Sequence, residues 1–148
     1  MESQMFDRFE RDADEYLAAH GLRVAADLLP RVREILTREA RHEASAYAGT
    51  GTVYGNTDLM RICAAQLWHA GVVEDVLLID RARATSMDAT GAIDGQMLLG
   101  AGVARTKEFL AALGTDEARR ILDYVVWLEE DYDAERYAAS LDSWYRTA

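Results

Sequence analysis

Apolar side chains recur at helical spacing along most of the chain, and their pattern predicts six to eight helices. The predicted helices cover residues 4–19, 22–46, 57–70, 72–83, 103–113, 116–128 and 132–144, with a short one ending near Gly100. Connections of one to three residues favour antiparallel neighbours. We therefore expect an all-α fold, a compact antiparallel helical bundle or stacked helix hairpins, in a single domain over residues 1–148.

Local signals refine the ends of these helices. Ser3, either Asn56 or Thr57, and Thr115 are predicted to cap helix starts, and glycines follow several predicted helix ends. Pro30 predicts a kink or a fresh helix start near residue 29. The run Val-Leu-Leu-Ile at 76–79 would suit a buried strand, but acids before it and arginines after it match the helix dipole, so we expect the central helix here.

Two segments interrupt the helical pattern. Residues 48–58 hold three glycines and several β-branched residues, and residues 84–95 are predicted to form a second loop. The first is either an ordered surface loop pinned by Tyr47 and Tyr54, or a partner-binding or active-site loop. Phosphate binding is disfavoured because Asp58 places a negative charge where an anion would sit and no Gly-Lys-Ser/Thr motif is present.

The charge of the chain limits its partners. The formal net charge is −10, which argues against non-specific nucleic-acid binding and against anionic membrane surfaces. No apolar run is long enough to span a membrane, and the first residues do not resemble a secretory signal. The single cysteine, Cys63, lies in an apolar context and is expected to be buried and inert. These features predict a cytoplasmic protein.

Motifs for catalysis or metal binding are incomplete. Glu39 and His42 have the Glu-x-x-His spacing of di-iron helix bundles, but the second copy at 66–69 begins with Gln66 rather than a carboxylate. We therefore predict no metal site, no cofactor and no catalytic residues. Asp80, flanked by apolar residues, is expected to form a structural ion pair with one of four arginines: Arg61, Arg81, Arg83 or Arg105.

The C-terminal segment has the strongest signature of recognition. Five acids fall within residues 129–135, and the last thirty-five residues carry nine acids and four bases. Aromatic anchors beside steering charges are typical of protein interfaces, although the same pattern also fits a terminal helix whose aromatics close the core. The predicted binding residues are Trp127, Glu130, Asp131, Tyr132, Asp133, Trp144 and, from the first loop, Tyr54.

Two functions remain open on these grounds. The first is a small acidic protein-binding module, an inhibitor, immunity or antitoxin-type protein that neutralises a basic partner, with a homodimer through the apolar helices as a further option. The alternative is a helical enzyme or ligand-binding protein whose pocket lies under the 48–58 loop and uses Tyr54, Asp58 and either His42 or His69. The predicted core contains Leu67, Val76, Leu77, Ile79 and Leu122.

Overall fold

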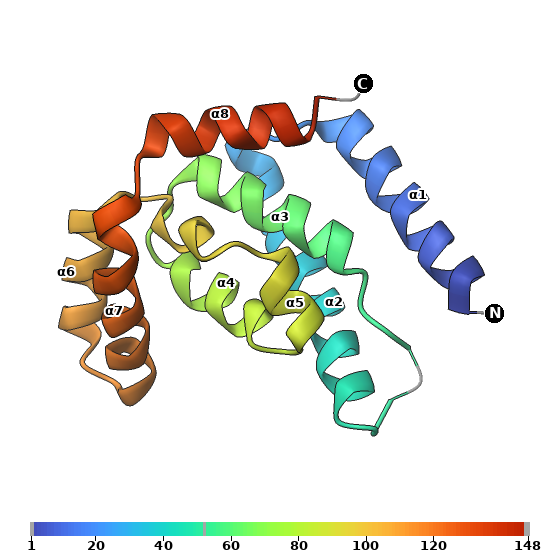
Figure 1. The fold of residues 1–148 in the computed structure, drawn as a ribbon, viewed down its shortest axis with the longest axis horizontal. Helices are drawn as coiled ribbons and strands as arrows, with labels where there is room; N and C mark the ends of the chain where they lie inside the picture. Colours follow the sequence, from blue (N-terminus) through green and yellow to red (C-terminus); the bar gives the residue numbers. More distant parts are fainter. Residues whose placement is uncertain (1, 52, 147–148) are drawn as a thin grey trace.

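Helices account for all the regular structure in the computed structural model, which describes residues 2–51 and 53–146 (Figure 1). The α-helices are α1 (Glu2–His20), α2 (Leu29–Tyr47), α3 (Thr57–Ala70), α4 (Asp75–Arg83), α5 (Met87–Ala92), α6 (Val103–Leu113), α7 (Asp116–Leu128) and α8 (Ala134–Trp144). Three 3-10 helices join them: η1 (Ala26–Leu28), η2 (Gly95–Leu99) and η3 (Glu129–Asp131). The prediction of an all-α helical bundle is confirmed.

Helix α3 occupies the centre of the bundle. It is apolar on almost every face, and its residues from Leu59 to Trp68 are buried except Arg61. A helix without a polar face must be covered on all sides. Helices α1, α2, α4, α5 and the η2 turn all pack against it. The sequence had suggested 72–83 as the central helix, but Leu77 and Leu78 of α4 are only partly buried.

The predicted caps and breaks largely hold. Asn56 and Thr115 cap α3 and α7 through hydrogen bonds from the backbone N–H groups of Leu59 and Ala118. Helix α2 starts afresh at Leu29 with Pro30 in its first turn, where a missing N–H costs nothing. Ser3 is not a cap, because α1 already begins at Glu2.

Two local predictions were wrong. Residues 84–95 are not an uninterrupted loop, because Ser86 caps the short helix α5 by accepting a hydrogen bond from Ala89 N–H. Six residues are too few to show helical periodicity, so no apolar pattern marks α5 in the sequence. The predicted core residues Leu77 and Leu122 are only partly buried, and Ile121 occupies the buried position on α7.

The C-terminal helix closes one side of the bundle. Helix α8 runs from the α6–α7 hairpin towards the C-terminal end of α1 (Figure 1). Its Tyr137 ring meets Trp68 of α3 edge-on with centroids 5.2 Å apart, and its hydroxyl donates to Asp94 at 3.0 Å. Tyr132, just before α8, accepts a hydrogen bond from Trp68 Nε1 at 3.1 Å. Part of the C-terminal aromatic cluster therefore belongs to the core.

Buried carboxylates are paired across helices. Arg33 of α2 donates two hydrogen bonds to Asp75 of α4, at 2.8 and 3.0 Å. Asp80 forms the predicted structural ion pair, but its partner is Arg120 of α7 at 2.7 Å rather than any of the four arginines expected. The packing of α7 against the α4 region brings Arg120 into reach, and this pairing is not visible from the local sequence.

Candidate functional site

A groove lies between α1 and the C-terminal end of α8. It has a volume of about 530 Å³ and continues along α1 towards Gly21. Its walls come from α1, the first turn of α3 and the end of α8. The residues that give it its chemistry, here called the acidic groove, are Glu10, Asp14, Asp58, Arg61, Trp144 and Tyr145.

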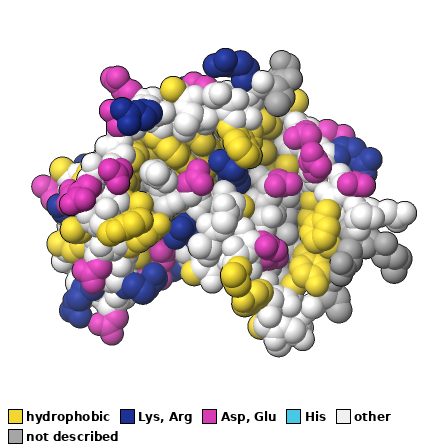
Figure 2. Space-filling view, viewed as in Figure 1, with side chains coloured by type: hydrophobic (Ala, Val, Ile, Leu, Met, Phe, Trp, Pro, Cys, Tyr) yellow, Lys and Arg dark blue, Asp and Glu magenta, His cyan; other side chains and the backbone are white. Residues whose placement is uncertain are grey.

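The acidic groove carries carboxylates without internal partners. Glu10, Asp14 and Asp58 form no ion pair with any residue that the structure describes, in contrast to most of the acids buried in the bundle. Figure 2 shows acidic side chains gathered between α1 and the start of α3. Their negative field therefore points towards solvent and is free to act on a partner.

Arg61 forms the floor of this groove. Its guanidinium stacks under the Trp144 ring at 4.5 Å and under Tyr145 at 5.8 Å, and one of its N–H groups reaches Asp94 at 3.4 Å. Burial raises the pKa of Tyr145 to about 12; the charges of Asp58 and Asp94 act in the same direction and Arg61 opposes them. Tyr145 is therefore a neutral hydroxyl at physiological pH, and the stack holds Trp144 over the groove.

A second, smaller cavity of about 130 Å³ opens beside the N-terminal half of α1. Four aromatic rings and three carboxylates line it, and none of the described residues around it has a basic side chain. These residues, here called the aromatic pocket, are Phe6, Phe9, Tyr47, Tyr54, Glu43, Asp58 and Asp88. Asp58 borders both the pocket and the groove, so the two form one continuous acidic and aromatic face.

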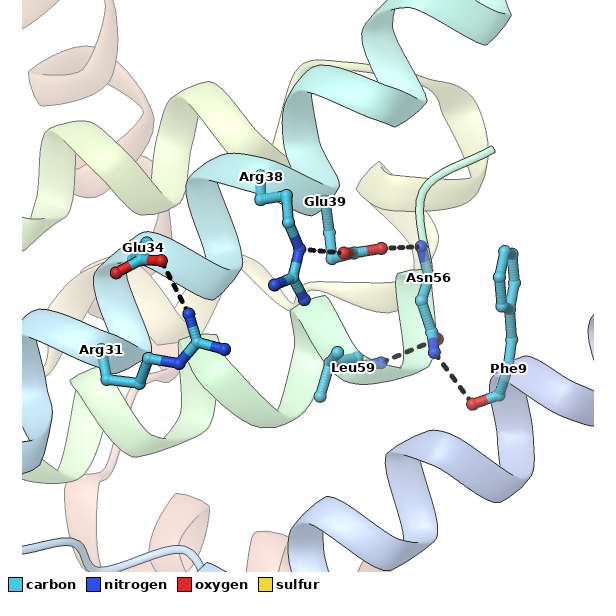
Figure 3. A network of polar contacts seen from close by, with 7 residues as sticks. All are labelled: Phe9, Arg31, Glu34, Arg38, Glu39, Asn56 and Leu59. Carbon is cyan, nitrogen blue, oxygen red and sulfur yellow. Dashed lines mark hydrogen bonds and ion pairs between the residues drawn. The ribbon is translucent and has the colours of Figure 1, made fainter. Parts of the chain in front are cut away.

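The wall of the pocket is held by two buried glutamates of α2. Glu39 accepts a hydrogen bond from Asn56 N–H at 3.0 Å, and Glu43 accepts one from Gly55 N–H at 3.2 Å. Asn56 in turn donates its side-chain N–H to the Phe9 carbonyl at 2.9 Å, which ties α1 to the start of α3 (Figure 3). These contacts, rather than the predicted tyrosines, anchor the segment, because Tyr47 and Tyr54 are exposed.

The two glutamates differ in charge compensation. Glu39 pairs with Arg38 at 2.8 Å, whereas Glu43 receives only hydrogen bonds, including one from the Ser86 hydroxyl at 2.6 Å. Glu43 is 5% exposed and forms no ion pair with any described residue. A buried carboxylate is normally paired or bound to a metal, and Glu43, which lines the pocket, has no such partner among the described residues.

The structure places the predicted binding residues in three separate areas. Trp144 lies over the acidic groove and Tyr54 lines the aromatic pocket. Trp127 is 72% exposed on α7 and stacks on Tyr124 with centroids 5.8 Å apart. Glu130, Asp131 and Asp133 are exposed at the α7–α8 connection, where Asp133 also caps α8, whereas Tyr132 is partly buried against Trp68.

Sequence reasoning missed Glu10, Asp14, Glu43 and the phenylalanines of α1 as site residues. The phenylalanines were read as part of an apolar helix face. For Glu43 a signal was present: the buried stripe of α2 runs through Val32 and Leu36 and continues in register at Glu39 and Glu43. A carboxylate on an apolar stripe indicates either a structural network or a site.

The histidines do not take part in either cavity. Neither His42 nor His69 lines the aromatic pocket. Burial lowers the pKa of His69, with Arg23 adding to the effect and Asp142 opposing it, and its Nε2 atom is buried without a hydrogen-bond partner. Among residues 2–51 and 53–146, no group of three His, Cys, Asp or Glu side chains is placed to hold a metal ion.

Comparisons with known proteins add no relative. No family model, curated protein or solved structure matches this chain. Within the described residues, every helix is too short or too polar to cross a membrane. The function of this protein is therefore inferred from the geometry and charge of the acidic groove and the aromatic pocket.

Proposed function

We propose that this protein binds a basic protein partner stoichiometrically through the acidic groove, as an inhibitor, immunity or antitoxin-type protein would. The observation that carries the proposal is the placement of three unpaired carboxylates, Glu10, Asp14 and Asp58, beside the exposed ring of Trp144. A small acidic cytoplasmic protein would suit this role, and the net charge of −10 favours the approach of a basic surface.

Charge and aromatic area have different parts in this proposal. The carboxylates act over about 8–10 Å at physiological salt and speed the encounter with a basic partner. Trp144 is 64% exposed and already held by Arg61 beneath it, so it offers contact area at little entropic cost. Removal of the charges should slow association, and truncation of Trp144 should speed dissociation.

A second candidate surface is the one predicted from the sequence at the α7–α8 connection. Its support is the exposed, stacked ring of Trp127 together with Glu130 and Asp131, which form no ion pair among the described residues. The two surfaces make the same kind of contact, so an experiment must compare them at equal net charge.

The test compares two variants that each remove three negative charges. The groove variant combines Glu10→Gln, Asp14→Asn and Asp58→Asn. The control variant combines Glu130→Gln, Asp131→Asn and Asp133→Asn, and the asparagine at 133 preserves the cap of α8.

The wild-type chain is used as bait to capture a basic protein from native lysate, and this partner is then purified. Its association and dissociation rates with the wild type and with both variants are measured at two salt concentrations. We expect the groove variant to lower the association rate at least tenfold and to flatten its salt dependence, while the control variant keeps the wild-type rate. Equal rates for the groove variant and the wild type, with both folded, would refute the proposal. Loss confined to the control variant would assign recognition to the α7–α8 surface.

A further inference from the structure

We propose that the aromatic pocket binds an alkylated ammonium group, such as a quaternary ammonium or a trimethylated lysine side chain. The inference goes beyond the proposed partner of the acidic groove, because a free ammonium compound is sufficient to occupy the pocket. Three observations support it: the size of the cavity, the aromatic rings around it and the buried carboxyl group of Glu43, which forms no ion pair with any described residue.

The cavity has the right size for a small organic cation. Its volume is about 130 Å³. An engineered protein cavity of about 150 Å³ holds one benzene molecule, so a trimethylammonium head group of comparable bulk fits this space. A nucleotide or a folded peptide would not fit inside it, although a peptide could insert one side chain.

The rings supply the surface that an alkylated cation prefers. Phe6, Tyr47 and Tyr54 are all exposed at the pocket, and Phe6 meets Phe9 edge-on with centroids 6.4 Å apart. Figure 2 shows hydrophobic side chains beside acidic ones along the inner side of α1. Aromatic faces carry partial negative charge and attract cations, and groups of them recognise quaternary ammonium and methylated lysine. Exposed rings gathered around a cavity indicate an interaction site.

The carboxylates set the sign of the ligand. Glu43 is buried without a cationic partner among the described residues, and Asp58 and Asp88 also line the pocket. Glu39, in the same helix, differs from Glu43 because it forms an ion pair with Arg38. Of these two glutamates only Glu43 is among the described residues that line the cavity, so a cation bound there would supply the ion-pair partner that Glu43 lacks. An anion would meet three negative charges and no positive one.

Alkylation of the ammonium follows from the aromatic lining. An unmodified ammonium is strongly hydrated and needs hydrogen-bond acceptors for its N–H groups. The oxygens of Glu43 already accept hydrogen bonds from Gly55 and Ser86. A trimethylated ammonium has no N–H groups and needs no such acceptors, and its methyl groups present an apolar, positively charged surface. It therefore suits a pocket lined by four aromatic rings better than an unmodified ammonium does.

The experiment is an NMR titration that follows the backbone amides of Gly55 and Asn56, which border the pocket. Four probes are compared: choline, its neutral isostere 3,3-dimethylbutan-1-ol, an acetylated trimethyllysine amide and the unmethylated lysine amide. We expect choline to bind at least tenfold more tightly than the neutral isostere, and trimethyllysine amide more tightly than lysine amide. Preference for choline over trimethyllysine amide would indicate a free small molecule, and the reverse would indicate a modified side chain.

Three variants locate the binding. Tyr54→Ala and Phe6→Ala remove exposed rings and should weaken choline binding about tenfold with little effect on folding. Glu43→Gln should weaken choline but not the neutral isostere. Trp127→Ala, on α7 away from the pocket, is the aromatic control and should leave choline binding unchanged.

Equal affinity for choline and its isostere would overturn the inference, as would wild-type choline binding by both ring variants. If Glu43→Gln fails to fold, the two ring variants and the isostere comparison still decide the result. A double variant, Glu10→Gln/Asp14→Asn, changes the acidic groove but leaves Asp58 in the pocket unchanged. It should bind choline like the wild type, so failure of the groove and failure of the pocket are distinguishable.

Discussion

Replacement of Gly55 by Ala tests the contact on which the aromatic pocket depends. Gly55 lies where the chain crosses α2 closely. A Cβ atom added there would meet the Glu39 carbonyl oxygen and would lie 2.7 Å from Glu43 Cβ and 3.1 Å from Glu43 N. These are helix backbone and near-backbone atoms that cannot move aside as the end of a flexible side chain can. The segment must therefore shift away from α2.

The expected loss follows from what that shift breaks. Added bulk in a tightly packed site costs about 1–3 kcal/mol. The hydrogen bonds from Gly55 N–H to Glu43 and from Asn56 N–H to Glu39 weaken at the same time, and each involves a buried carboxylate. A hydrogen bond to a charged group contributes about 1.5–3 kcal/mol. Because the shift weakens rather than removes these bonds, we expect a total loss of about 2–4 kcal/mol.

The assay is urea unfolding at pH 7, with Gly91→Ala as the matched control. An added Cβ at Gly91 meets nothing within 4 Å, and Gly91 lies in the helix α5. There alanine should stabilise by up to about 1 kcal/mol, because glycine is the weaker helix former. A loss below about 0.5 kcal/mol for Gly55→Ala would show that the segment yields at no cost and would refute the tight crossing.

Three further outcomes are expected. Leu36→Ala should cost about 2–5 kcal/mol in urea unfolding because its side chain is fully buried, whereas Leu77→Ala should cost about 1–2 kcal/mol because it is partly buried. Arg33→Ala leaves the buried carboxylate of Asp75 unpaired and should cost about 1–3 kcal/mol in the same unfolding assay. Arg31→Ala, which breaks the exposed pair with Glu34, should cost less than about 0.5 kcal/mol. Burial lowers the pKa of His69 in the folded state, so on acidification the unfolded chain takes up this proton first. The free energy of unfolding should therefore fall as the pH drops below about 6.5. Urea unfolding of His69→Gln and the wild type at pH 7.5 and pH 5.5 measures how much of this pH dependence His69 causes.

The sequence predicted the features of this fold that depend on neighbours along the chain. Helix periodicity, the caps at Asn56 and Thr115 and the fresh start at Pro30 are each encoded within a few residues. The segment 76–79 was assigned correctly to a helix because dipole-matching charges flank it. Such signals are local, so they survive without knowledge of the tertiary structure.

Features that depend on tertiary packing could not be predicted from the sequence. Asp80 was expected to pair with Arg61, Arg81, Arg83 or Arg105. Its partner is Arg120, forty positions away along the chain. The central position of α3 rather than α4 was likewise a matter of which helices cover which face. The acidic groove is formed between α1 and the end of α8, and no sequence pattern within either helix predicts that the two helices lie close together.

The stripe of α2 shows how sequence alone could have located part of the site. Positions 29, 32, 36, 39 and 43 follow one another at helical spacing on one face, and the first three are apolar and buried. Continuation of that face with Glu39 and Glu43 leaves two explanations for each carboxylate: compensation within the fold or compensation by a ligand. In the structure Arg38 forms an ion pair with Glu39, whereas Glu43 accepts hydrogen bonds but forms no ion pair with any described residue, which is why we propose a bound cation there. Tyr54→Lys removes one ring of the aromatic pocket and adds a competing cation beside it, so it should abolish choline binding. Choline binding at the wild-type level by this variant, measured by the same NMR titration, would contradict the assignment of the pocket.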